Sequence, residues 1–315
     1  MMRSHVVVWA LLAATLTPGL AGADPLLPRE TADVRGADSG SVGLFNPLRL
    51  GFSHAEIELH PVAALVAPHA DLRMPLLRAQ QPGDWRTTAI LGLALPSPAW
   101  RMEKPFGFAG DLVPSCKVAD IDPKLASWCD RPGWMLSPKF GVQVSKGLAM
   151  NGAVERGVLT LAGEVATGWL LSGKAARPLD AWAPAAVQFA PYIGRFRAQA
   201  RAAYDHAVTD WLRLRAEVAG YYVERPADDP LSPWYASVHV GADVQTSEHT
   251  RIALGAIYWN YDKHQRTVAV GADGYATATY GRSHEVWPAV DLVWQWGSSA
   301  PLAARRADVP ASESP

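Results

Sequence analysis

Hydrophobic and polar residues alternate along most of the chain with a period of two. Between Trp234 and Gln245, aliphatic side chains occupy every second position from Ala236 to Val244, and polar or small side chains lie between them. Successive side chains of a β-strand point to opposite faces, so this pattern predicts a strand with one apolar and one polar face. A helix would mix the two kinds of side chain on one face.

The same alternation predicts ten strands. Several run eleven residues or more, which favours tilted membrane-spanning strands over the shorter strands of a secreted β-sandwich. The ten segments are Ser53–His60, His69–Leu77, Trp85–Leu95, Lys139–Lys146, Gly157–Leu171, Tyr192–Tyr204, Trp211–Val223, Trp234–Gln245, Arg251–Tyr261 and Glu285–Trp296.

The connections between these strands are mostly short at one end and longer at the other, although Pro61–Pro68 and Gly147–Arg156 blur the separation. Short periplasmic turns and long extracellular loops are typical of bacterial outer-membrane barrels. The segment Thr267–Gly281 also alternates. It predicts either a hairpin that extends the barrel above the membrane or two further spanning strands. Its less apolar faces favour the hairpin, and therefore ten strands over the alternative of twelve.

Aromatic side chains gather near the predicted strand ends, where a barrel would meet the two membrane interfaces. This predicted aromatic girdle consists of Trp85, Trp169, Tyr192, Tyr204, Tyr222, Trp234, Tyr258, Trp294 and Trp296.

In its alternating strands, its loop lengths and its aromatic strand ends, Ser53–Trp296 resembles the porin-like class of Gram-negative outer-membrane β-barrels. It does not carry the motif of a particular family. The resemblance implies an all-β, antiparallel, up-and-down transmembrane barrel in contact with outer-membrane lipid and lipopolysaccharide. It also implies insertion by the barrel assembly machinery, which reads a final strand ending in aromatic residues such as Trp294 and Trp296. The chain continues 19 residues beyond Trp296, whereas many members of the class end there.

The N-terminus has the pattern of an export signal. Arg3 precedes an apolar run, and Ala21-Gly22-Ala23 fits a cleavage site. The run is short for a membrane-spanning helix, which favours cleavage after Ala23 over an uncleaved anchor. The expected division is a signal peptide at 1–23, a periplasmic N-terminal segment at 24–52, the barrel at 53–296 and a flexible tail at 297–315. The N-terminal segment is either a tether or folds back into the structure.

Composition excludes several classes of protein. The 315 residues carry 29 basic and 30 acidic side chains, and this balance argues against a nucleic-acid-binding protein. Charges spread through the apolar segments argue against a bundle of membrane helices. Cys116 and Cys129 are the only cysteines, and in an exported protein they predict one disulfide within the longest outer loop. No pattern indicates a metal ion or a cofactor.

The polar faces of the strands place charged side chains inside the predicted barrel. Isolated buried charges are costly, so a narrow lumen filled with ion pairs is the expected outcome. Like charges on neighbouring strands repel, so the arginines of two adjacent strands either meet acids across the barrel or leave the wall open to an anion. The predicted cluster is Arg195, Arg197, Arg201, Arg213, Arg215 and Glu217, and its predicted acidic partners are Glu56, Glu58, Asp71, Glu164, Asp243 and Asp291.

The sequence therefore favours a passive barrel that is not an enzyme. It would be either a narrow pore with a charge-lined lumen, with anion selectivity as the sharper hypothesis, or a structural membrane protein. One alternative is a protease or lipid hydrolase active at the rim, as some barrels of this class are. His60 beside Glu58, together with Ser232 and His284, could serve there, although no catalytic motif surrounds them. A second alternative is surface binding or adhesion through the disulfide loop. The oligomeric state is not predicted.

Overall fold

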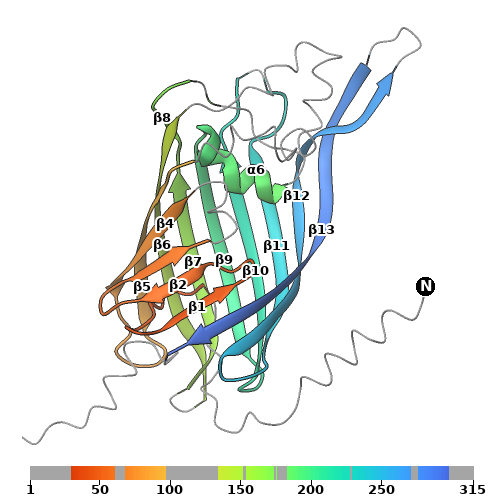
Figure 1. Ribbon diagram of the computed structural model, residues 1–315. Coiled ribbons are helices and arrows are strands. Elements are labelled where there is room, and N and C mark those ends of the chain that lie inside the picture. The colour runs from red at the N-terminus through yellow and green to blue at the C-terminus, as the bar shows by residue number, and fades with distance from the viewer. Residues whose placement is uncertain are drawn as a thin grey trace, which may run out of the picture.

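The protein forms a closed antiparallel β-barrel of twelve strands with one further strand outside the ring (Figure 1). The structure is a computed structural model that describes residues 30–60, 68–96, 134–151, 154–173, 175, 183–227, 229–270 and 276–297. Each strand pairs with the next along the chain, and the first strand pairs with the last. The barrel is therefore of the up-and-down type that the sequence predicts.

The ring consists of β1 (Gly40–Gly43), β2 (Leu48–Gly51), β3 (Glu56–Leu59), β4 (His69–Leu77), β5 (Trp85–Ala94), β6 (Met135–Asn151), β7 (Val154–Ala166), β9 (Arg197–Ala207), β10 (Leu212–Val223), β11 (Trp234–Gln245), β12 (Thr250–Val270) and β13 (Ala276–Trp296). The short β8 (Trp169–Leu170) pairs with the beginning of β6 outside the ring. Helix α6 (Ala183–Phe189) and the 3₁₀ helix η3 (Ala190–Ile193) precede β9.

The prediction of ten strands is wrong, and the alternative of twelve is correct in number. The two additional strands are β1 and β2, which lie in the expected N-terminal segment before Ser53. The segment Thr267–Gly281 instead extends β12 and β13, whose pairing continues to Val270 and Ala276 beyond a bulge. Strands of four residues show too little alternation to be recognised in a sequence.

The outer face of the wall is apolar. In β11 the side chains of Val238 and Val240 point outward, and Val240 is 54% exposed. A closed barrel pairs the backbone of its wall strands, and an exposed apolar belt of this extent is favourable in lipid and not in water. The fold is therefore that of a membrane-spanning β-barrel. Within the described residues, no helix is long and apolar enough to cross a bilayer.

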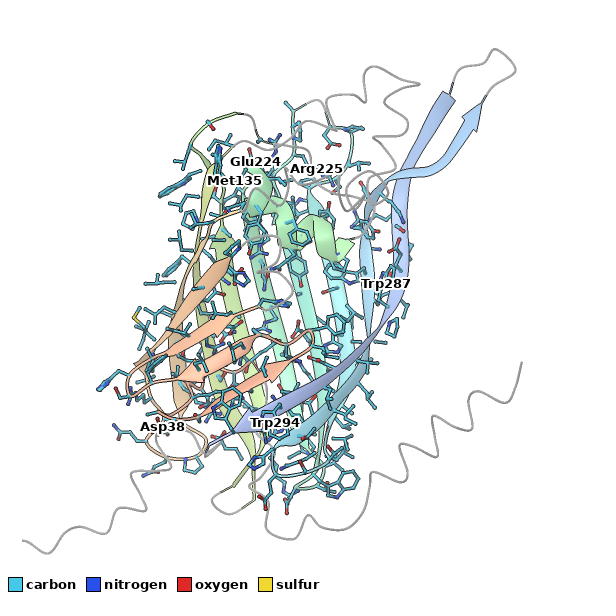
Figure 2. All side chains as sticks on the ribbon, viewed as in Figure 1. Asp38, Met135, Glu224, Arg225, Trp287 and Trp294 are labelled. Atoms are coloured by element: carbon cyan, nitrogen blue, oxygen red, sulfur yellow. The ribbon has the colours of Figure 1, made fainter. Side chains whose placement is uncertain are left out.

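Most of the predicted girdle lies on this outer face. Trp294 is exposed near the inner end of β13, the end where the short turns lie (Figure 2). Tyr222 and Trp296 are partly buried. Tyr192 is the exception, because it is buried in η3 inside the barrel and not on a strand. The exposed members are Trp85, Trp169, Tyr204, Trp234, Tyr258 and Trp294.

One section of the wall, formed by β1, β2 and β3, is only four residues high. Asp291 of β13 holds the turn between β1 and β2. Its carboxylate accepts backbone hydrogen bonds from Leu44 at 2.8 Å, Phe45 at 3.2 Å and Asn46 at 2.7 Å. A Cβ atom at Gly43 would lie 2.5 Å from this carboxylate, which explains a glycine there. The turn is thereby fixed where Phe45, Asn46 and Pro47 line the cavity of the barrel.

Three sequence predictions lie outside the described residues. These are the signal peptide at 1–23, the disulfide between Cys116 and Cys129, and the tail beyond Gly297. They stay predictions.

A charged side chain on the outer face tests whether this face contacts lipid. Val240 lies midway along β11, so Val240→Arg is expected to lower the free energy of unfolding by about 2–4 kcal/mol, the cost typical of an arginine near the bilayer midplane. Urea titration of the protein folded into lipid vesicles measures this change, with Val240→Leu as the control for size. A loss below about 1 kcal/mol would contradict the orientation.

Candidate functional site in the barrel lumen

The residues that precede β1 run inside the barrel near its inner end. The Ala32 amide donates to Ser145 Oγ at 2.8 Å, and Thr88 Oγ1 donates to the Ala32 carbonyl at 2.5 Å. Arg73 Nη2 donates to the Thr31 carbonyl at 2.6 Å. We call residues 30–36 the plug segment. Of the two alternatives for the N-terminal segment, folding back into the structure is therefore the correct one for residues 30–36, which fill part of the lumen.

Two charged residues anchor the middle of the plug segment. Arg86 Nε lies 3.2 Å from Asp33 Oδ1, and the Arg35 amide donates to Glu56 Oε2 at 3.0 Å. Burial raises the pKa of Asp33, although Arg86 opposes this shift. Burial also lowers the pKa of Arg35 to about 10, with Glu56 opposing. Each side chain has an opposite charge beside it, Arg86 for Asp33 and Glu56 for Arg35.

Glu30 begins the plug segment and carries its most central contact. Its carboxylate forms ion pairs with Arg201 of β9 and Arg215 of β10, the latter at 3.0 Å. Nine-tenths or more of each arginine side chain is buried. Both arginines also reach wall carboxylates, Arg201 at 3.5 Å from Glu217 and Arg215 at 3.3 Å from Asp205.

An apolar cap fills the outer end of the lumen. Helix α6 and the beginning of η3 pack against inward-facing side chains of β10, β11 and β12. The cap consists of Ala183, Ala186, Val187, Ala190, Val223, Tyr235, Trp259 and Tyr261. The lumen is thus apolar at its outer end and charged at its inner end.

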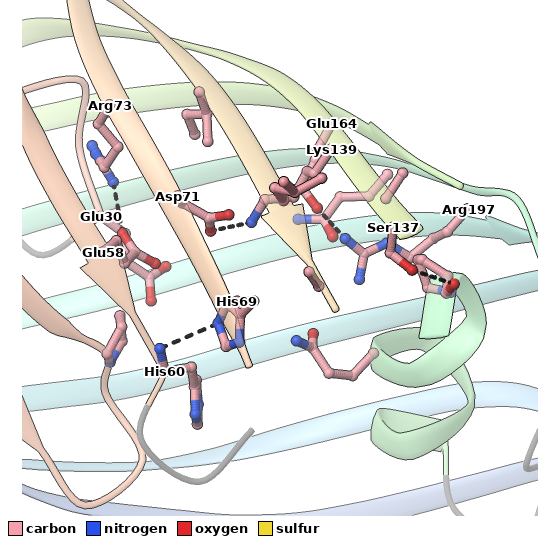
Figure 3. A pocket seen from close by; sticks show the side chains of 18 of the residues that line it. Glu30, Glu58, His60, His69, Asp71, Arg73, Ser137, Lys139, Glu164 and Arg197 are labelled. Carbon is pink, nitrogen blue, oxygen red and sulfur yellow. Dashed lines mark hydrogen bonds and ion pairs between the residues drawn. The ribbon is translucent and has the colours of Figure 1, made fainter. Parts of the chain in front are cut away.

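A chamber of about 310 Å³ lies between the cap and the plug segment (Figure 3). Its walls are polar and charged. The wall strands contribute five cationic side chains, Arg49, Arg73, Lys139, Arg197 and Arg201, and three carboxylates, Glu58, Asp71 and Glu164. Glu30 of the plug segment adds a fourth carboxylate. Phe45 also lines the chamber and is 64% exposed, so the chamber is not sealed beside the turn between β1 and β2.

The cations of the chamber are held by carboxylates of other wall strands. Arg49 Nη2 lies 3.0 Å from Glu58 Oε2, and Lys139 forms an ion pair with Asp71. Arg73 is 1% exposed and lies 3.2 Å from Glu56, which is 0% exposed. Removing one member of such a pair leaves an uncompensated buried charge, which costs more than the pair contributes. The network therefore fixes the shape of the chamber.

The predicted arginine cluster divides among several partners. Arg197 pairs with Glu164, and Arg213 is buried where the charges of Asp205 and Asp243 act on it. Arg195 lies apart, 3.9 Å from Glu224 near the outer rim. Arg201, Arg215 and Glu217 lie together beside the plug segment.

Four of the six predicted acidic partners, Glu56, Glu58, Asp71 and Asp291, have partners outside the arginine cluster. Glu56 and Glu58 pair with Arg73 and Arg49, Asp71 pairs with Lys139, and Asp291 binds the turn between β1 and β2. Asp243 lies 3.8 Å from Arg251. Of the predicted partners, Glu164 of β7 pairs with Arg197, and the charge of Asp243 of β11 acts on Arg213. The rest of the compensation comes from Asp205, Glu217, Glu224 and Glu30.

Several lumen residues were missed by the sequence reasoning. Asp205 continues the inward alternation of β9, and Arg49 alternates with Leu48 and Leu50, so both carried a weak signal. Glu30 lies in no strand, so no alternation in the sequence indicated that it faces the lumen. Lys139 was placed in a strand but not among the inward charges.

The rim residues of the enzyme alternative do not form one cluster. The His60 amide donates to His69 Nε2 at 3.2 Å at the edge of the chamber, and Glu58 pairs with Arg49. His284 Nδ1 lies 2.6 Å from the Tyr258 hydroxyl on the outer face of the wall. The Ser232 amide donates to Asp262. Within the described residues, no group of His, Cys, Asp and Glu has the arrangement of a metal site.

Comparisons with solved structures give distant likenesses to outer-membrane proteins. Two structures of OmpT of Vibrio cholerae, one expressed in the outer membrane and one folded in vitro, each match with a TM-score of 0.40 at 10% and 9% identity. The matches cover 79% and 81% of this chain and 64% of OmpT, so the chain spans less than two thirds of those proteins. The Pseudomonas putida toluene transporter TodX matches with a TM-score of 0.33 at 7% identity, over 82% of this chain and 77% of TodX. No family model and no curated protein matches the chain.

The expectation that the chain is not an enzyme is corrected at this point. Its structural neighbours include two structures of the outer-membrane protein OmpT, and a barrel fold by itself does not exclude catalysis. The fold therefore gives no ground for excluding catalysis. Identities of 10% and below assign no reaction either.

Removing a buried cation tests the ion-pair network. Arg73→Met leaves Glu56 without its closest cation and is expected to lower the free energy of unfolding by about 3–5 kcal/mol. The matched control is Arg156→Met, because Arg156 pairs at 3.6 Å with the exposed Asp210 and its loss is expected to cost less than about 1 kcal/mol. Urea titration in detergent micelles measures both. Equal losses in the two variants would refute a structural role for the buried network.

Proposed function

We propose that the barrel is a narrow outer-membrane channel for a small anionic solute, and that the chamber is the solute site along its path. The observation that carries this proposal is the charge of the chamber. The wall strands contribute five cationic and three acidic side chains to its lining. Rings of arginine and lysine favour anions in pores, because they stabilise an anion that has lost part of its hydration.

The size of the chamber supports a small solute. A volume of about 310 Å³ lies at the lower limit of ordinary small-molecule pockets. It exceeds the roughly 30 Å³ share of a single water molecule about tenfold. A metabolite with one or two charged groups fits this space, whereas an oligosaccharide or a peptide does not.

The path through the barrel is narrow at both ends. The apolar cap fills the outer mouth, and the plug segment occupies the inner end. The exposed Phe45 beside the low section of the wall marks the side on which a solute reaches the chamber. We therefore expect low and intermittent conductance, not that of an open porin.

Two substitutions within one ion pair test this function. Lys139→Gln removes a cation from the chamber and Asp71→Asn removes its partner, so both break the same contact but change the charge in opposite directions. Anion over cation permeability is expected to fall at least about twofold in the first variant and to rise by a similar factor in the second. Reversal potentials in planar bilayers under a salt gradient measure this ratio.

Folding of each variant is confirmed first by the shift in gel mobility on boiling. Equal selectivity in both variants would place the conduction path outside the chamber. A folded wild-type barrel without conductance and without flux of small carboxylates into vesicles would refute the channel. That result would favour a role as a structural membrane protein over a channel.

A further inference from the structure

The contact of Glu30 with two arginines differs from the other ion pairs of the lumen. The other pairs that line the chamber join one wall strand to another, whereas Glu30 belongs to the plug segment. Its carboxylate lies between Arg201 and Arg215, and both Glu30 and Arg201 line the floor of the chamber. The structure therefore shows a carboxylate bound in a site made by two other strands.

The two arginines are held in place without Glu30. Glu217 lies 3.5 Å from Arg201 and also pairs with Arg215, and Asp205 lies 3.3 Å from Arg215. These wall carboxylates hold both guanidinium groups, and Glu217 contacts the same two nitrogens, Arg201 Nη1 and Arg215 Nη2, that bind Glu30. Arg201 Nε is buried and has no hydrogen-bond partner among the described residues, so it can donate to a further acceptor. The site would thus persist if Glu30 moved away.

We propose that Arg201 and Arg215 form a binding site for the carboxylate group of a small organic acid, and that Glu30 occupies this site as a built-in competitor. This inference rests on the proposed channel function and specifies its substrate class and its regulation. A carboxylate solute that enters the chamber exchanges with Glu30 on the two arginines. The exchange replaces one carboxylate by another, so it leaves no buried arginine uncompensated.

The exchange also links solute binding to opening of the inner end. Glu30 belongs to the plug segment, and its contact with the arginines holds this part of the segment at the chamber floor. A tethered competitor acts at a high effective concentration and therefore weakens the apparent affinity for a free solute. Once the Glu30 carboxylate is displaced, the remaining anchors of the segment include the Glu30 and Thr31 carbonyls, which accept from Arg201 and Arg73. The contacts around Ala32, Asp33 and Arg35 also remain.

Chemical rescue tests this site without requiring conduction. Glu30→Ala removes the carboxylate and leaves a space that matches acetate. Acetate is expected to raise the urea midpoint of the variant in a saturable manner, with an apparent affinity at least about tenfold higher than for the wild type. Sodium chloride at equal ionic strength gives the baseline, and sodium phosphate shows whether the site takes any anion or prefers a carboxylate.

The matched control is Glu224→Ala, since Glu224 pairs with Arg195 at 3.9 Å and is 46% exposed as a side chain. It is expected to show no saturable response to acetate. If Glu30→Ala fails to fold, Glu30→Gln keeps the size of the side chain and is titrated in the same way. No saturable response in either Glu30 variant, or an equal response in Glu224→Ala, would overturn the site.

The outcome separates this site from the proposed function. Acetate rescue in a barrel that passes no solute would keep the carboxylate site and refute the channel. Carboxylate flux without rescue would keep the channel and refute Glu30 as the competitor.

Discussion

The compensation of buried charge inside a narrow barrel is the constraint on which the rest of the structure depends. Glu56 and Arg73 are almost completely buried, and neither could remain charged there alone. Every wall strand points alternate side chains inward, so charges on different strands must meet across fixed registers. A shift of one residue would move a whole set of charges to the lipid face. The ion pairs therefore select the register of the strands as well as the shape of the chamber.

The same constraint explains how the wall tolerates its low section. Strands of four residues contribute few backbone hydrogen bonds, and β1 joins β13 over only four residue pairs. Asp291 compensates for this by binding three backbone amides of the turn above β1, and Glu56 accepts the Arg35 amide from inside the barrel. Closure of the ring at this point thus depends on inward-facing carboxylates and on the plug segment together. The N-terminal residues are part of the barrel architecture.

The sequence predicted the barrel where strands are long and the period of two is sustained, as in β10 and β11. It failed where tertiary contacts replace local pattern. β1 and β2 are too short to alternate measurably, and Glu30 reaches Arg215 from 185 positions away. The inward direction of Arg197, Arg201 and Arg215 followed from alternation, but their partners did not, because pairing depends on the stagger between strands. Faces of strands can be read from a single sequence, whereas contacts across a lumen cannot.

Opening the two ends of the lumen would cost different amounts of free energy. This difference argues that passage of a solute is controlled at the inner end. The cap buries aromatic side chains such as Tyr235, Trp259 and Tyr261 against α6, and exposing them would cost about 1.5–3 kcal/mol each. The floor is closed by ion pairs and hydrogen bonds, and a carboxylate solute can replace one set of these, the contacts of Glu30 with Arg201 and Arg215. Replacing one carboxylate by another on the same arginines changes the free energy little. Exposing the apolar side chains of the cap to water is not compensated by any new contact. A small acid that reaches the chamber beside Phe45 would therefore open the floor before it displaced the cap.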